Sequence, residues 1–231
     1  AGMGYNWQWY QIPRYFYRVI DEELIWGPLA TGLVITIEIS LYSMLLTLVL
    51  GLLTALLRMS NSLSGQVLAR VYLETIRNTP MLVQIYVFYF VIAPVLGIDR
   101  FWTGVLCLGL FEGSFASEII RAGINSVPRG QWEAASSVGL SRFASYRYVV
   151  LPQAIPLMLP PMTGVLINLI KHSAIVSVIA VFELTTEGRN IIADTYMAFE
   201  VWLTVAGIYL VLTVSLSICV GYLERRLRQP A

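Results

Sequence analysis

Charged side chains are scarce in this chain of 231 residues: they make up 13% of it, against about a quarter of an ordinary soluble domain. Hydrophobic residues make up 57%, and the mean hydropathy is +0.71. Residues 41–57 and 101–111 contain no charged side chain. Because a segment that crosses the hydrocarbon core needs roughly 20 mostly apolar residues, this composition excludes a soluble globular domain and predicts an integral membrane protein.

Histidine and cysteine are nearly absent, with one histidine and two cysteines in the chain. A single histidine excludes a zinc site of the H-E-x-x-H type, and neither a G-x-S-x-G motif nor a glycine-rich phosphate-binding loop occurs. Cys107 and Cys219 lie in apolar runs and are interpreted as buried apolar residues rather than as a disulfide. An enzyme with its own nucleotide site is therefore disfavoured, and the net charge of +1 indicates no nucleic-acid partner.

The apolar segments predict an all-α integral membrane protein with five transmembrane helices, at residues 29–57, 81–96, 102–122, 160–181 and 199–223. Residues 1–28 are expected to form an extracytoplasmic or interfacial segment, and residues 29–231 the transmembrane domain, with its longest connection at residues 123–159. The aromatic residues 5–26 are predicted to form a helix in the membrane interface, with an ordinary aromatic anchor as the alternative. Gly109 and Gly113 have the spacing of a close helix contact.

Arginine is distributed unevenly between the connections, and this predicts how the chain is oriented in the membrane. Ten arginines follow the first, third and fifth segments, whereas the opposite connections hold four arginines diluted by seven acidic residues. The ten are Arg58, Arg70, Arg77, Arg121, Arg129, Arg142, Arg147, Arg225, Arg226 and Arg228. Because short loops rich in Lys and Arg stay in the cytoplasm, the N-terminus is predicted to lie outside the cell and the C-terminus inside it.

A motif with fixed spacing lies in the longest connection. Glu133, Ala134 and Ala135 are followed after three residues by Gly139, and after nine more by Val-Val-Leu-Pro at residues 149–152. This spacing resembles the EAA loop in the permease subunits of type I ABC importers. The resemblance implies that the loop couples the permease to a cytoplasmic ATPase. Glu-Ala-Ala alone is common in helices, so the identification rests on the full spacing.

The residue types in this loop suit a short helix that docks on another protein. The residues spaced i+3, i+4 and i+7 from Trp132 are Ala135, Ser136 and Gly139. They share one mostly small helix face, which we expect to lie in a groove of the partner. Glu133, near the helix start, suits the helix dipole and is free to meet a basic group of the partner. Gly139 can adopt the left-handed conformation that ends a helix.

The resemblance extends over residues 32–226 and points to permeases for polar amino acids. The segments that carry it are residues 77–84 (Arg-Asn-Thr-Pro-Met-Leu-Val-Gln), 118–124, 129–131, 151–154 and 168–175. Among these permeases the chain looks most similar to those for glutamate and aspartate, and this closer resemblance rests on residues 6–9 and 160–168. Two residues depart from the family pattern: Glu112 is an additional carboxylate, and His172 stands where aspartate or asparagine is usual.

The resemblance implies a subunit of an ATP-driven importer in the bacterial inner membrane, with no cofactor bound to this chain. ATP and Mg²⁺ would bind to a separate dimer of cytoplasmic ATPases, and a second permease subunit, identical or homologous, would complete the pathway. An extracytoplasmic solute-binding protein would deliver a polar amino acid, with glutamate or aspartate favoured. The alternative is a stand-alone secondary transporter or channel, although the internal repeats that such proteins often carry are not found.

Ionisable residues inside the predicted spans indicate a functional site, because a charge in hydrocarbon is costly. Glu112 and Lys171 have opposite charges and similar depths, so they are predicted either to line the substrate path or to form a structural ion pair. A packing role is the alternative for His172, as for most lone histidines. The residues assigned to the substrate path are Gln84, Glu112, Glu118, Asn168, Lys171 and His172.

Overall fold

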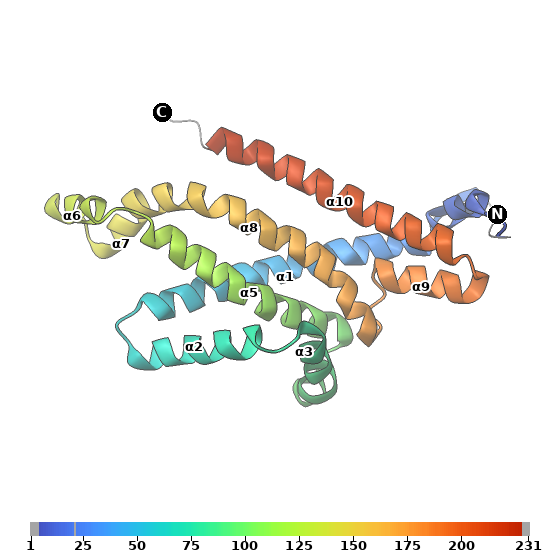
Figure 1. Cartoon of the computed structure of the whole chain (residues 1–231), viewed down its shortest axis with the longest axis horizontal. Coiled ribbons are helices and arrows are strands. Elements are labelled where there is room, and N and C mark those ends of the chain that lie inside the picture. The colour runs from blue at the N-terminus through green and yellow to red at the C-terminus, as the bar shows by residue number, and fades with distance from the viewer. Residues whose placement is uncertain (1–4, 21, 228–231) are drawn as a thin grey trace.

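The computed structural model describes residues 5–20 and 22–227, and these form the expected all-α membrane protein. Four helical stretches are long and apolar enough to cross a bilayer: Pro28–Met59, Arg100–Asn125, Arg142–Ile179 and Ala198–Tyr222. They run roughly along the long axis of the molecule (Figure 1). A bent pair, Leu63–Arg77 with Met81–Leu96, makes a fifth crossing when it is counted as one span.

The N-terminal segment is not the predicted interfacial helix. It contains a 3₁₀ turn, η1 (Trp9–Tyr15), and an antiparallel hairpin of β1 (Tyr17–Ile20) and β2 (Glu23–Trp26), with Tyr17 paired with Trp26. Both strands are rich in aromatic and β-branched residues, which suit a pleated surface better than a helix. Arg228 and residues 1–4 lie outside the described residues.

A buried glutamate ties the N-terminal segment to the last helix, α10 (Ala198–Leu227). Glu200 is fully buried, and its carboxylate accepts hydrogen bonds from the Tyr5 hydroxyl at 2.5 Å and the Gln8 amide at 2.6 Å. The ring of Phe199 packs edge-on against Tyr5, with the ring centroids 4.9 Å apart. These contacts hold the segment beside the start of α10, at the end of the molecule that also carries α9 (Figure 1).

Small residues set the contact between α1 (Pro28–Met59) and α5 (Arg100–Asn125). A Cβ atom added at Gly109 would lie 2.6 Å from Cδ2 of Leu46, and one added at Gly51 would lie 2.9 Å from Cβ of Ala116. The predicted close helix contact at Gly109 and Gly113 is therefore confirmed, with α1 of the same chain as its partner. The two helices approach closely because each glycine leaves room for a side chain of the other helix.

The second predicted span, residues 81–96, is one arm of the bent pair of helices. Helix α2 (Leu63–Arg77) is followed by α3 (Met81–Val87), η2 (Phe88–Ile92) and α4 (Ala93–Leu96), and the chain turns by 108° between Arg77 and Met81. Pro80 at the break has no N–H to continue the helix. Gln84 donates from its side-chain amide to the carbonyls of Ile76 at 2.7 Å and Thr79 at 2.8 Å, which replaces hydrogen bonds lost at the break.

The fourth span begins well before the predicted Pro160. One continuous stretch runs through α7 (Arg142–Ser145), η3 (Tyr146–Val150), α8 (Leu151–Ser173) and η4 (Ala174–Ile179). Three prolines lie inside α8: Pro156, Pro160 and Pro161. Membrane helices tolerate proline where neighbouring groups or local helix adjustments satisfy the freed backbone, and the π-helical turn η3 directly precedes Pro152.

A further helix, α9 (Leu184–Thr195), occupies the connection that was expected between the fourth and fifth spans. Glu183 caps it, because the buried carboxylate accepts from the backbone amides of Thr185 and Thr186, both at 2.8 Å. Its third donor is the Tyr209 hydroxyl of α10, also at 2.8 Å. Burial nevertheless raises the pKa of the Glu183 carboxyl. The capping carboxylate thereby joins α9 to the last span.

The contact between α1 and α5 gives a stability test. Gly109→Ala is expected to lower the free energy of unfolding by about 1–3 kcal/mol, because its Cβ must displace Leu46 from the contact. Gly207→Ala on α10 is the matched control, since its Cβ meets no atom within 4 Å and alanine favours a helix. Thermal unfolding of both variants in one detergent checks this. Equal midpoints would show that the two helices do not meet at Gly109.

Candidate functional site

Helix α6 (Arg129–Ser137) carries the Glu-Ala-Ala motif and lies at one end of the molecule (Figure 1). Gly139 follows it with φ of 77°, in the left-handed region. The Gly139 amide donates to the Ser136 carbonyl at 3.0 Å, and the Leu140 amide to the Ala135 carbonyl at 3.1 Å. This pair of bonds is the Schellman arrangement that ends a helix, so the predicted role of Gly139 is confirmed.

The predicted docking face of α6 is divided between packing on the chain itself and exposure. Ala135 is 3% exposed, and Trp132 packs edge-on against Tyr146 with the ring centroids 5.0 Å apart. Ser136 and Gly139 of the same face are exposed, and so are Glu133 and Ala134. The large apolar side chain of Trp132 could have indicated which side of α6 packs inward. Burying a tryptophan gives more favourable free energy than burying alanine or serine.

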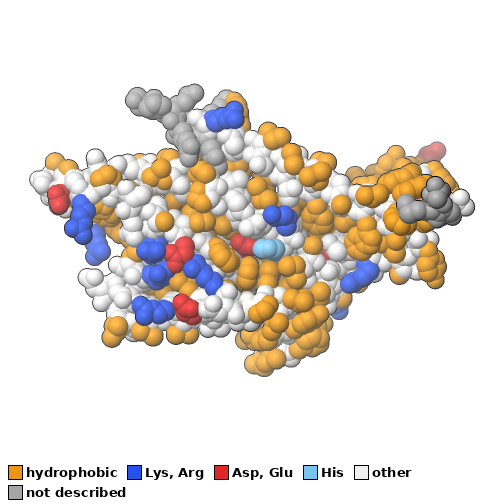
Figure 2. All heavy atoms as spheres, in the orientation of Figure 1, with side chains coloured by type: hydrophobic (Ala, Val, Ile, Leu, Met, Phe, Trp, Pro, Cys, Tyr) orange, Lys and Arg blue, Asp and Glu red, His pale blue; other side chains and the backbone are white. Residues whose placement is uncertain are grey.

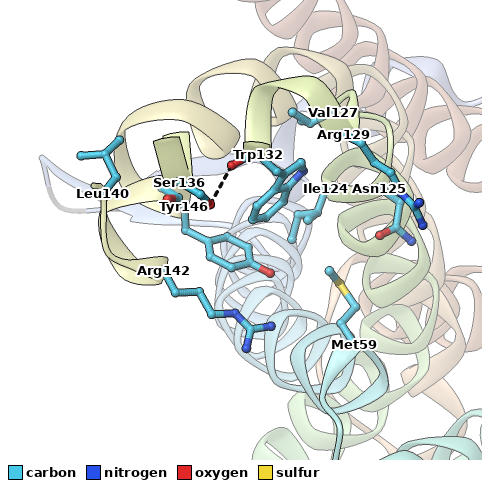
Figure 3. A pocket seen from close by; sticks show the side chains of 11 residues that line it. Met59, Ile124, Asn125, Val127, Arg129, Trp132, Ser136, Leu140, Arg142 and Tyr146 are labelled. Atoms are coloured by element: carbon cyan, nitrogen blue, oxygen red, sulfur yellow. Dashed lines mark hydrogen bonds between the residues drawn. The ribbon is translucent and has the colours of Figure 1, made fainter. Parts of the chain in front are cut away.

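A hollow of about 750 Å³ lies between α6 and the neighbouring helix ends. Figure 3 shows Trp132 and Tyr146 near its centre, with Met59, Arg129 and Arg142 around them. Because the hollow occupies the space beside the Trp132–Tyr146 contact, α6 is held to the rest of the chain over a narrow area. The helix therefore presents Glu133 and Ala134 at the tip of the molecule with little support behind them.

The middle of the transmembrane region holds a buried carboxylate paired with the single histidine. Glu112 on α5 is 2% exposed, and its Oε1 lies 2.7 Å from Nδ1 of His172 on α8. The His172 side chain keeps 31% of its surface exposed, and Phe111 packs edge-on against it with the ring centroids 5.8 Å apart. Asn168 lies one turn before His172 on the same face of α8. An exposed imidazole is thus held by a carboxylate that solvent cannot reach.

The predicted pair of Glu112 and Lys171 does not form. Lys171 is exposed and, within residues 5–20 and 22–227, has no ion-pair or hydrogen-bond partner. Adjacent residues on a helix point about 100° apart, so the phase of α8 lets only one of Lys171 and His172 meet α5. His172 takes that place. Gln84 also lies away from this pair, since its amide is bonded at the bend between α2 and α3.

Glu118 lies nearer the α6 end and is surrounded by arginines from three helices. It forms ion pairs with Arg58 of α1, with Arg121 of α5 at 2.8 Å and with Arg77 of α2 at 3.5 Å. Arg77 also donates to the Ser114 carbonyl and lies over the Phe115 ring, 5.3 Å from its centroid. Glu118 was expected on the substrate path, and these arginines were expected in the cytoplasmic connections. Their convergence depends on the packing of α1, α2 and α5.

A pocket of about 220 Å³ opens at this cluster, and we call it the arginine pocket. Its polar lining residues are Arg58, Gln66, Arg70, Glu74, Arg77 and Glu118. Figure 2 shows Lys and Arg side chains gathered around Asp and Glu on the face that also carries the single histidine. The chain thus exposes two polar groups on one face, one at His172 and one nearer to α6.

Comparisons with known proteins agree on one family. The family model described as "Binding-protein-dependent transport system inner membrane component" matches residues 47–229. The probable glutamine ABC transporter permease protein GlnM of Bacillus subtilis is 40% identical over 182 residues, 78% of this chain and 84% of the relative. The glutamine transport system permease protein GlnP of Escherichia coli is 37% identical over 214 residues, 90% of this chain and 98% of the relative.

A solved structure matches over nearly the same range. It is the crystal structure of an amino acid ABC transporter with histidines, and its TM-score is 0.78 at 37% sequence identity. The match covers 86% of this chain and 94% of the other chain. The arrangement of helices described above is therefore also that of an amino acid ABC transporter.

The left-handed helix end at Gly139 can be tested locally. Gly139→Ala is expected to lower the free energy of local unfolding at the end of α6 by about 1–2 kcal/mol, because a Cβ is strained at positive φ. Amide hydrogen exchange at residues 135–140 should speed up about tenfold as the end of α6 frays. Gly130→Ala lies in the same helix with no atom within 4 Å of its Cβ and should slow exchange or leave it unchanged. Equal exchange in both variants would contradict the helix end described here.

Proposed function

This chain belongs to the family of binding-protein-dependent transport system inner membrane components, as the permease subunit of an amino-acid ABC importer, and from that premise we propose that it imports L-glutamine. Family membership decides against the stand-alone secondary transporter that composition left open. The chain is a transport component of the inner membrane, and ATP hydrolysis belongs to a separate subunit in these systems.

Two observations support glutamine over an acidic amino acid. Two glutamine permeases are 40% and 37% identical to this chain, whereas the sequence-based preference for glutamate or aspartate rested on two short segments. The exposed group at mid-membrane is also an imidazole backed by the carboxylate of Glu112. A carboxylate at that depth repels an acidic side chain and leaves a neutral carboxamide unaffected.

The observation that carries the proposal is the contact between His172 and Glu112. In this proposal the imidazole is neutral, so that its Nδ1–H donates to the Glu112 carboxylate and Nε2 is left as an acceptor. Nε2 then takes an N–H of the substrate, from its ammonium or its carboxamide. His172 contacts substrate in this scheme, and Glu112 is a positioning residue that fixes the tautomer and the ring orientation.

The remaining subunits follow from the division of labour in the family. We infer that two cytoplasmic ATPases, a second permease subunit, identical or homologous, and an extracytoplasmic solute-binding protein complete the importer. Helix α6 docks on the ATPase through Glu133 and Ala134, while Ala135 and Gly139 hold the helix in shape. This places the α6 end and the C-terminus in the cytoplasm, in line with the arginines that gather at that end.

The substrate contact can be tested by uptake into proteoliposomes that contain the complete importer. His172→Ala is expected to raise KM for L-glutamine about tenfold, as expected for a lost hydrogen bond of about 1.4 kcal/mol. His172→Asn retains an acceptor and should restore part of the affinity. Arg18→Gln, on the exposed hairpin far from His172, is the control. Wild-type KM in His172→Ala would remove the imidazole from the substrate path.

The docking of α6 can be tested at one position. Ala134→Arg places a large side chain on the exposed face of α6, so the chain should fold normally but copurify with less than about a tenth of the ATPase. Ala134→Ser keeps the position small and should retain the ATPase. Full ATPase recovery with Ala134→Arg would contradict both the docking face and the cytoplasmic orientation of the α6 end.

A further inference from the structure

Helix α2 has three faces, and one of them is unusual for a helix in a candidate membrane span. The buried face consists of Gly65, Ala69, Leu73 and Ile76. The exposed apolar face consists of Leu63, Val67, Leu68 and Val71. Between them runs a polar stripe at i, i+4, i+8 and i+11, which consists of Gln66, Arg70, Glu74 and Arg77. Because charges do not face lipid tails, the apolar face meets lipid and the polar stripe lines an aqueous space.

The arginine pocket lies on this polar stripe and holds an excess of positive charge. Arg58, Arg70, Arg77 and Arg121 face only two carboxylates, Glu74 and Glu118. Three of the four arginines share Glu118, and Glu74 is engaged by the Asn78 side chain at 2.8 Å. Arg70 is exposed and has no partner among the described residues. Four positive and two negative charges leave a surplus of two, which attracts an anion into a polar cleft.

The arginine pocket is joined to His172 by aromatic side chains along one stripe of α5. His172 contacts Phe111, and the ring centroids of Phe111 and Phe115 are 5.4 Å apart. Phe115 in turn lies under the guanidinium of Arg77. A molecule that leaves His172 toward the α6 end therefore passes two aromatic rings and then meets arginine.

We propose that the arginine pocket is a second binding station of the import path, which takes the α-carboxylate of the amino acid after it leaves His172. The inference rests on the proposed function for the direction of movement and for the substrate class. Arg70 is the group with free donors, and its planar guanidinium matches a carboxylate with two parallel hydrogen bonds. The phosphate of an anionic lipid offers similar chemistry, so the experiment must separate these two sources.

The first experiment measures protection of Arg70 in the complete importer, reconstituted in phosphatidylcholine nanodiscs. Phenylglyoxal modifies accessible arginines, and peptide mass spectrometry compares Arg70 with Arg18. L-glutamine and sulfate should each slow modification of Arg70 severalfold. L-glutaminamide, which lacks the carboxylate, should not slow it, and Arg18 should react equally throughout. No protection of Arg70 by glutamine or sulfate would overturn the proposal.

A second set of discs, which also contains phosphatidylglycerol, tests the lipid source. Protection by this lipid alone, with no further effect of glutamine, would assign the pocket to a headgroup and overturn the proposal. In uptake assays Arg70→Gln should raise KM for glutamine roughly threefold to tenfold, whereas Arg18→Gln should match wild type. If the wild-type importer takes up no glutamine, the proposed substrate fails, and sulfate protection still decides whether the pocket binds anions.

Discussion

The absence of water in the hydrocarbon core requires that every polar group there find a partner within the protein, and the main features of this structure follow from that requirement. At the break before Met81 the carbonyls freed by Pro80 are bonded by Gln84. At mid-membrane Glu112 is bonded by His172. Nearer to α6, Glu118 gathers three arginines. The contacts of Glu112 with His172 and of Glu118 with Arg58 and Arg77 join helices that are separate in sequence, so polar pairing fixes the bundle alongside the close approach of α1 and α5.

The same requirement determines which groups remain available to a ligand. Glu112 and Gln84 are buried: Glu112 is bonded to His172, and the side-chain nitrogen of Gln84 is bonded to two carbonyls, while Gln84 Oε1 has no partner among the described residues. His172 is partly exposed with one nitrogen uncommitted, and Arg70 is exposed without a partner in the described part of the chain. A charge that lacks a partner inside a membrane is costly. An unpaired charged or polar side chain is therefore tolerated only where water or a ligand can reach it. The two proposed stations on the exposed face are therefore places where structural pairing is incomplete, as it also is at Lys171.

Sequence patterns predicted the spans, the motif and the helix end at Gly139, because these depend on composition and local backbone geometry. They did not predict contacts that depend on helix phase. Lys171 and His172 are neighbours in the chain, and only the rotation of α8 against α5 decides which of them meets Glu112. The start of α8 was also missed, because proline rules drawn from soluble helices place a boundary at Pro160, whereas the membrane helix continues through three prolines. On α6, Trp132 and Ala135 pack inward although small residues suggested docking for this face, because burying Trp132 gains the most free energy, whereas Ser136 and Gly139 stay exposed as expected.

The continuous stretch from Arg142 to Ile179 connects the proposed coupling helix to the proposed substrate contact. Tyr146, near its start, holds Trp132 of α6, and His172, near its end, faces Glu112. His172 follows Tyr146 by 26 positions, which span about 39 Å at the helical rise. In the proposed coupling, a displacement of α6 would reach His172 along a single helix, without an intervening interface. Pro156, Pro160 and Pro161 lie between these two points and each removes a backbone hydrogen bond, so bending of this helix concentrates there. The prolines thus place the flexible part of the connection between the α6 contact and the substrate contact, where a small change of angle moves His172 relative to Glu112.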